Sequence, residues 1–289
     1  LIRFYITNAA NTRTFNLGIN GIKTKLVGGD SGAYEKETWK ENVILGPSER
    51  AVVETLFDRP GTYTVEHKTP NRVYKMGTVV VSEDSATPSY GQIFSSLRTN
   101  KIAVADIDPF RPYFNKPIDK YLSLSIEMMG GMEGMGSMGS INRMNNGSSA
   151  HNHAASPDGI EWEDDMEMMN TVMSKEDTQW KIIDKNTGKE NMDIDWKFKA
   201  GDKIKIRITN EKDSEHPMQH PIHFHGQRFL IIDQNGTKND NLVWKDTVLV
   251  PAGQYIDILL DASNPGVWMA HCHILEHIEA GMMLKFEVQ

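Results

Sequence analysis

The stretch His271-Cys272-His273-Ile274-Leu275-Glu276-His277-Ile278-Glu279-Ala280-Gly281-Met282 lies near the end of the 289-residue chain. It contains the only cysteine of the protein and three of its ten histidines. A thiolate, imidazoles and a thioether are soft to borderline ligands, and two histidines with one cysteine and an axial methionine are typical of a blue-copper site. Only part of this ligand set is local, so another imidazole must come from elsewhere in the chain.

A second histidine-rich stretch, His220-Pro221-Ile222-His223-Phe224-His225, can supply it. Both stretches are predicted to be β-strands, along which successive side chains point to opposite faces. One face can then gather His220, Cys272, His277 and Met282 around a single metal ion. The opposite face gathers four more imidazoles, those of His223, His225, His271 and His273. Two sites back to back, joined through the backbone of Cys272, form a layout suited to electron transfer.

Two other interpretations of these residues are a histidine-rich loop and a zinc site. Zinc in proteins is bound mainly by cysteine, histidine and carboxylate ligands. A zinc site would therefore need neither the thioether nor the second set of imidazoles. The residue types and their parity favour copper.

The pattern H-P-x-H-x-H followed by H-C-H-x-x-x-H-x-x-x-x-M resembles that of the multicopper oxidases at every position. The resemblance implies that Cys272, His271 and His273 carry electrons to a trinuclear copper cluster, where dioxygen is reduced to water. It also implies a full set of copper ligands: His220, Cys272, His277 and Met282 for type 1 copper, His223 for type 2 copper, and His225, His271 and His273 for type 3 copper.

Composition limits the other functions open to the chain. The net charge of -8 and the pI of about 5.7 argue against nucleic acid and anionic membranes as partners. No apolar run approaches the roughly 18 residues that a transmembrane helix requires. A lone cysteine excludes an internal disulfide bond.

Residues 1–84 consist of short β-branched and aromatic runs separated by turn signals, which predicts an all-β domain. Three segments resemble the middle cupredoxin domain of three-domain multicopper oxidases: residues 1–9, 28–32 and 45–50. That domain is a Greek-key β-sandwich that binds no copper, and it begins earlier than Leu1 does here. We therefore expect a tandem cupredoxin architecture whose first domain is incomplete at its N-terminus, with His67 in a structural role.

The rest of the chain divides into a connector and a last domain. Residues 85–117 have little periodicity and are predicted to be an interdomain connector. Residues 118–289 are expected to form the C-terminal cupredoxin domain, which contains the type 1 site. Within it, residues 128–173 form an insert with ten methionines, together with His151 and His153.

The Met-rich insert has two interpretations. Its glycine, serine and asparagine content favours a flexible segment in which the methionines are incidental. Thioethers are also suitable ligands for Cu(I), and the insert resembles that of the bacterial copper-efflux oxidases, which oxidise cuprous ion. Met218, Glu215, Glu279 and Met283 lie near the type 1 residues and are candidate contacts for substrate Cu(I), or else packing and solvated groups.

The reducing substrate is left open between Cu(I) and small phenols. His216 stands where efflux oxidases tend to have a carboxylate, which weakens the assignment of Cu(I). The resemblance implies that the protein acts in the periplasm or outside the cell.

The trinuclear cluster of the family is built from four H-x-H pairs, and this chain offers two of them in the expected places. His151-Asn152-His153 is a poor substitute because of its setting in the insert. We therefore expect a missing N-terminal cupredoxin domain to be a partner. Two alternatives are a copper-binding or electron-transfer module without oxygen reduction, and an enzyme similar to copper nitrite reductase.

Overall fold

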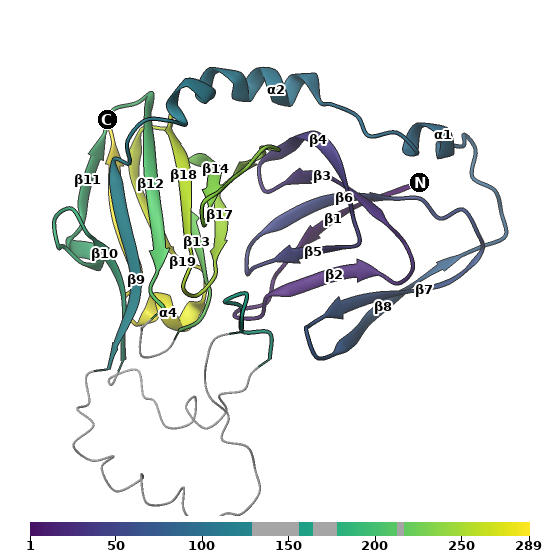
Figure 1. The fold of residues 1–289 in the computed structure, drawn as a ribbon, viewed down its shortest axis with the longest axis horizontal. Helices are drawn as coiled ribbons and strands as arrows, with labels where there is room; N and C mark the ends of the chain where they lie inside the picture. The colour runs from purple at the N-terminus through teal and green to yellow at the C-terminus, as the bar shows by residue number, and fades with distance from the viewer. Residues whose placement is uncertain (129–155, 164–177, 213–216) are drawn as a thin grey trace, which may run out of the picture.

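The computed structural model describes residues 1–128, 156–163, 178–212 and 217–289 (Figure 1). Most of the Met-rich insert, including His151 and His153, lies outside these residues, as do Glu215 and His216. The strands form four sheets, arranged as two sandwiches that lie side by side (Figure 1). The prediction of an all-β fold is confirmed. Among the described residues, no helix is long and apolar enough to cross a membrane.

The first sandwich contains two antiparallel sheets of four strands each. Its core is small, and Leu26, Leu45, Ala51 and Val53 are its buried members. In sheet order the strands are β1 (Ile2–Thr7), β6 (Arg50–Thr55), β3 (Thr24–Gly29) and β4 (Gly32–Lys40), then β5 (Asn42–Leu45), β2 (Phe15–Ile19), β7 (Gly61–Lys68) and β8 (Val73–Val81).

The second sandwich is larger and contains the histidine-rich strands. In one sheet the strand order is β10 (Thr178–Asp184), β9 (Lys120–Met128), β12 (Asp202–Asn210), β18 (Tyr255–Ala262), β14 (Arg228–Gln234) and β15 (Thr237–Lys238), with β16 (Trp244–Lys245) also paired to β14. In the other sheet the order is β11 (Asp195–Phe198), β20 (Met283–Val288), β19 (Gly266–Cys272), β13 (His220–Phe224) and β17 (Thr247–Val250).

The core of the second sandwich lies between these two sheets and includes Cys272 and Met282, both fully buried. Alternating isoleucines at 204, 206 and 208 on β12 point into it, as their period of two predicts. The candidate type 1 residues are therefore embedded in packed apolar side chains, which restricts their rotamers and excludes water.

Strand β4 was not expected from the sequence. Its one fully buried position is occupied by an acid, Glu35, rather than by an apolar residue. Glu35 is 2% exposed, accepts a hydrogen bond from the Leu242 amide and forms an ion pair with Arg111. Glu37 pairs with Lys25 and Arg98. A strand whose most buried side chain is a paired charge is difficult to find from hydrophobic periodicity.

The connector between the sandwiches is more ordered than its composition indicates. It contains α1 (Gly91–Phe94), α2 (Lys101–Ile107) and a 3₁₀ helix η1 (Asp108–Tyr113), which cross the outside of both sandwiches (Figure 1). Ile107 and Phe110 pack against Trp244 and Leu259 of the second sandwich. Sequence periodicity did not indicate these helices, because they are short and their apolar residues are few.

Helix α2 begins at a side-chain cap. Asn100 has an extended backbone, and its Oδ1 atom accepts hydrogen bonds from the amides of Ile102 and Ala103, both at 3.1 Å. Replacing an asparagine cap by alanine costs about 0.5–2 kcal/mol. We expect Asn100→Ala to lower the free energy of unfolding by that amount in urea denaturation, while Asn100→Asp retains the acceptor and most of the stability. Equal losses in both variants would contradict the cap.

Candidate metal centre

Three buried side chains converge inside the second sandwich. The Nδ1 atoms of His220 and His277 lie 3.2 Å apart, and the Sγ atom of Cys272 lies 3.7 Å from the first and 3.4 Å from the second. All three residues are buried. A circle through three atoms at these separations has a radius of about 2.0 Å, close to the bond lengths of first-row metals to nitrogen and sulfur ligands. The donor set therefore fits a single metal ion.

The chain folds back on itself to bring these ligands together. After β19 ends at Cys272, the short helix α4 (Leu275–Glu279) presents His277, and β20 begins directly after Met282. The Met282 amide donates to the His277 carbonyl at 2.8 Å, and the Cys272 amide donates to the Met282 carbonyl at 3.1 Å. These two backbone bonds close the loop and keep Met282 beside Cys272 and His277.

Trp180 of β10 covers the two imidazoles. Its ring stacks on His277 with 3.8 Å between ring centroids, and it meets the edge of His220 at 5.1 Å. The Trp180 carbonyl accepts a hydrogen bond from Asn191, which fixes this part of the strand. No motif indicates this role, although Trp180 is the first aromatic residue after the Met-rich insert.

Burial raises the pKa of the Cys272 thiol well above its ordinary range. The thiolate is the form that binds metals, so a cation is needed to displace the proton. Without one, Cys272 is an inert buried thiol. The site has the chemistry of a metal centre rather than of a cysteine nucleophile.

A second group of imidazoles lies on the opposite face of the same strands. His223 is directly opposite His271 in the β13–β19 register, as Ile222 is opposite Cys272. The Nε2 atoms of His225 and His271 are 2.9 Å apart, a separation that two nitrogen ligands of one metal ion can adopt. His273 is 5.7 Å from His271 between ring centroids. We call these four residues the four-imidazole face.

Three imidazoles of this face have a lowered pKa, which favours their neutral form. Burial is the main cause that lowers the pKa of His225, His271 and His273, and that of His271 falls to about 4. The Nδ1 atom of His271 donates to the Cys272 carbonyl at 2.7 Å, which leaves its Nε2 lone pair free of a proton. A neutral imidazole with one nitrogen fixed in this way is the form that ligates metals.

His223 is oriented by Asp246 and Thr247, at the start of β17. Its Nδ1 atom lies 2.9 Å from the Asp246 carbonyl oxygen and 3.0 Å from Thr247 Oγ1. The carbonyl can only accept, so Nδ1 carries the proton and Nε2 is the ligand atom. The Asp246 carboxylate in turn forms a bidentate ion pair with Arg50 of the first sandwich, at 2.7 and 2.6 Å. Burial alone would raise the pKa of the Asp246 carboxyl, but the hydrogen bond from Arg50 helps to hold that pKa far below its usual range.

Sequence reasoning assigned no chemistry to Asp246, Thr247 or Arg50. The available signal was a charged and a hydroxyl residue inside the otherwise apolar run Trp244–Val250. The first sandwich holds no candidate ligand. Its Arg50 pairs with Asp246, whose carbonyl oxygen contacts the candidate ligand His223. His67, the histidine of that sandwich, is buried, and its Nδ1 atom accepts from the Asn16 amide at 3.0 Å.

Lys245, next to Asp246, forms a second buried ionic contact between the sandwiches. Its Nζ atom lies 3.0 Å from Asp30 and 3.2 Å from Glu49, whose side chains are 0% and 9% exposed. The two carboxylates outweigh the effect of burial and raise the pKa of Lys245 above its usual range. The lysine is therefore charged at neutral pH.

The described candidate substrate residues differ in their exposure. Met218 is buried in the main core, Glu279 is exposed on α4, and Met283 is half-buried opposite His271. Glu215 lies outside the described residues.

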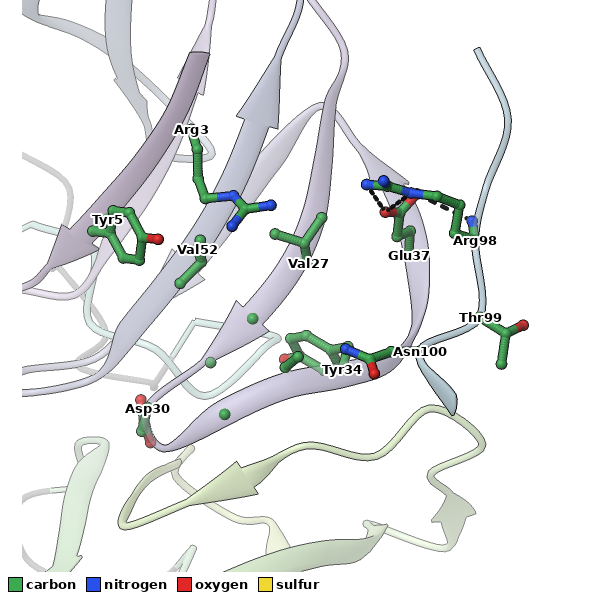
Figure 2. A pocket seen from close by; sticks show the side chains of 14 residues that line it. Arg3, Tyr5, Val27, Asp30, Tyr34, Glu37, Val52, Arg98, Thr99 and Asn100 are labelled. Atoms are coloured by element: carbon green, nitrogen blue, oxygen red, sulfur yellow. Dashed lines mark hydrogen bonds and ion pairs between the residues drawn. The ribbon is translucent and has the colours of Figure 1, made fainter. Parts of the chain in front are cut away.

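A cleft of about 610 Å³ opens in the first sandwich and includes none of the candidate ligands. Figure 2 shows Arg3, Tyr5 and Val52 along one wall, with Arg98 on the far side joined to Glu37. Arg3 pairs with Glu54, so the cationic side chains of this cleft are already neutralised by carboxylates.

Comparison with known proteins gives one family. The family model for multicopper oxidases matches residues 161–289. An oxidoreductase of Aspergillus fumigatus, tpcJ, is 35% identical over 105 residues, which are 31% of this chain and 17% of that protein. The multicopper oxidase mco of Staphylococcus epidermidis is 39% identical over 97 residues, which are 33% of this chain and 22% of that protein.

A solved multicopper oxidase of Campylobacter jejuni, described as a metallo-oxidase, superimposes with a TM-score of 0.64 at 24% identity. The match covers 99% of this chain and 53% of that one, and it shows the shared fold. The chain thus spans about a fifth of the curated relatives and about half of the solved protein. Residues 161–289 thus match the multicopper oxidase family, and both sandwiches share the cupredoxin fold of the solved multicopper oxidase.

Proposed function

We propose that this chain is the C-terminal part of a copper-dependent oxidase. The observation that carries the proposal is the division of one strand into two faces. Cys272 meets His220 and His277 within 3.7 Å, whereas its neighbours His271 and His273 lie on the four-imidazole face. A one-electron site and a multi-imidazole site are thereby joined by the backbone of a single residue.

The residues take distinct roles in this proposal. Type 1 copper is held by His220, Cys272, His277 and Met282, type 2 copper by His223, and type 3 copper by His225, His271 and His273. Bound copper would supply single-electron transfer and the reduction of dioxygen to water. The protein excludes water from Cys272 by burial, covers the type 1 imidazoles with Trp180, and presents the Nε2 atom of His223 by engaging its Nδ1 atom.

The four-imidazole face is half of a trinuclear site. Among the described residues, the remaining histidine is His67, which lies in the first sandwich and belongs to its packing. We propose that an N-terminal cupredoxin domain supplies the other imidazoles. Without it, the same strands would serve as a copper-binding and electron-transfer module.

The reducing substrate that we propose is Cu(I), with small phenols as the alternative. The Met-rich composition of residues 128–173 supports Cu(I), because thioethers are soft ligands. Met218, Glu279 and Met283 are the described candidates for contacts to it, and Glu215 is the fourth candidate. A periplasmic or extracellular location fits a protein that handles copper and dioxygen.

Copper content, absorption and EPR spectra, measured with the mass of the intact protein, test this function. We expect a blue type 1 band together with a type 2 EPR signal, and a polypeptide that includes a first cupredoxin domain. A blue band with a single copper per chain and no added mass would leave the electron-transfer module. Absence of any blue band after loading with Cu(II) would reject both.

A further inference from the structure

Residues 156–163 lie in the middle of the Met-rich insert, and we call them the seam anchor. They contain no methionine: six of the ten methionines precede them, and four follow. The anchor is fixed to the turn after β17, where the Ala252 amide donates to the Gly159 carbonyl at 2.8 Å and Gln254 Nε2 donates to the Asp158 carbonyl at 2.9 Å. The insert is thus attached to the protein at its centre as well as at its two ends.

Gly159 allows this close approach. Its φ angle is +74°, and a Cβ atom there would lie 2.4 Å from the Ala252 carbonyl oxygen. Both the left-handed backbone and the contact exclude other residues. The anchor is therefore specified by sequence at this position.

The anchor contacts the strand that carries a type 1 ligand. The Glu161 amide donates to Gln219 Oε1 at 2.7 Å, and Gln219, 2% exposed, directly precedes His220. Ile160 and Trp162 form a buried cluster with Leu249 of β17. In the β13–β17 register Leu249 is opposite the residue that follows His220, so the anchor holds the start of β13 by both polar and apolar contacts.

The other end of the anchor reaches the first sandwich. Glu163 accepts hydrogen bonds from Thr69 Oγ1 at 2.9 Å and from the Tyr74 hydroxyl at 2.6 Å. The Trp162 ring lies 6.1 Å from that of His67. Eight residues therefore connect the β7–β8 hairpin to the start of β13 across the boundary between the sandwiches.

We propose that the seam anchor is a positioning element for His220, which couples the first sandwich and the insert to the type 1 ligand strand. This inference rests on the proposed function only in naming His220 as a copper ligand. The Glu161 amide fixes the Gln219 side chain, the Ile160 and Trp162 contacts fix β17 against β13, and Glu163 holds the far end. Loss of the anchor would let the start of β13 shift and change the geometry of the type 1 copper.

Gly159→Ala tests the effect on the ligand strand, with Gly188→Ala as the matched control. Both glycines have φ near +70°, but a Cβ atom at Gly188 meets nothing within 4 Å. Backbone strain is therefore shared, and only the contact with Ala252 differs. In copper-loaded protein we expect Gly159→Ala to shift the blue absorption band and the reduction potential, while Gly188→Ala keeps wild-type values. Wild-type spectra in both variants would overturn the proposal.

Tyr74→Phe tests the coupling to the first sandwich in protein without metal, with Tyr63→Phe as the control. The Tyr63 hydroxyl donates to the carbonyl of Arg59, just before β7, so each variant loses the hydrogen bond that its tyrosine hydroxyl donates. We expect faster hydrogen exchange of the Glu161 amide in Tyr74→Phe alone. Equal exchange in both variants would overturn the coupling. If wild-type protein shows no blue band, the proposed function fails, whereas this exchange measurement still decides whether the anchor holds Gln219.

Discussion

Cys272→Ser is expected to abolish the blue absorption of the copper-loaded protein while the fold is retained. Serine fills nearly the same volume in the fully buried site, but its hydroxyl oxygen is a hard and weak ligand for copper. The four-imidazole face does not use this side chain, so copper bound there should remain. Absorption and EPR spectra of the loaded variant, with far-ultraviolet circular dichroism for the fold, measure both effects.

Met282→Leu is the matched variant for that experiment. Leucine keeps the packing of the buried Met282 position and removes only the thioether. Because the thiolate and two imidazoles remain, we expect the blue band to persist. The reduction potential should rise, since the loss of a donor destabilises Cu(II) relative to Cu(I). A blue band in Cys272→Ser, or its loss in Met282→Leu, would contradict the assigned ligand set.

Lys245→Met is expected to lower the free energy of unfolding by about 3–5 kcal/mol, the usual cost of removing one partner from a buried ion pair. Methionine matches the lysine stem, but Asp30 and Glu49 would stay buried without the ammonium group that lies 3.0 and 3.2 Å from them. Urea denaturation at pH 7 measures the loss. Lys285→Met, at an exposed position of β20, is the control and should change stability by less than about 0.5 kcal/mol.

The pH dependence of this variant gives a second measurement. In the wild type the raised pKa of Lys245 means that its contribution to stability is complete at neutral pH and is lost only as the pH rises through the folded-state pKa. In the variant, protonation at acidic pH removes the charge of the unpaired carboxylates. The difference in stability between the two proteins should therefore shrink as the pH falls. A constant difference from pH 4 to pH 7 would assign the loss to packing rather than to charge.

The sequence was sufficient to predict which candidate ligands share a face, because the geometry of a strand is local and periodic. Strand parity alone separates Cys272 from His271 and His273, because a residue cannot face the same side of a strand as its neighbour. The separation of His220 from His223 follows in the same way. The structure places both groups on the faces that this parity predicts.

The network around Asp246 could not be predicted in this way. Arg50 lies 196 residues from Asp246 in the sequence, and neither residue belongs to a spacing that distinguishes it from other charged residues. Strand β4 was not predicted for a related reason, since its fully buried position holds Glu35, an acid that pairs with the distant Arg111. Pairing between distant charges becomes visible only when the two sandwiches are placed together.

The loop that joins Cys272 to Met282 also has a thermodynamic consequence. Three of the four proposed type 1 donors come from eleven consecutive residues, while His220 comes from another strand. An unfolded chain could bring the three local donors together, but the fourth requires pairing of β13 with β19. A ligand that binds only the folded form stabilises it by mass action. Copper should therefore protect the second sandwich against thermal unfolding, while the first sandwich gains only what is transmitted through Arg50, Lys245 and the seam anchor.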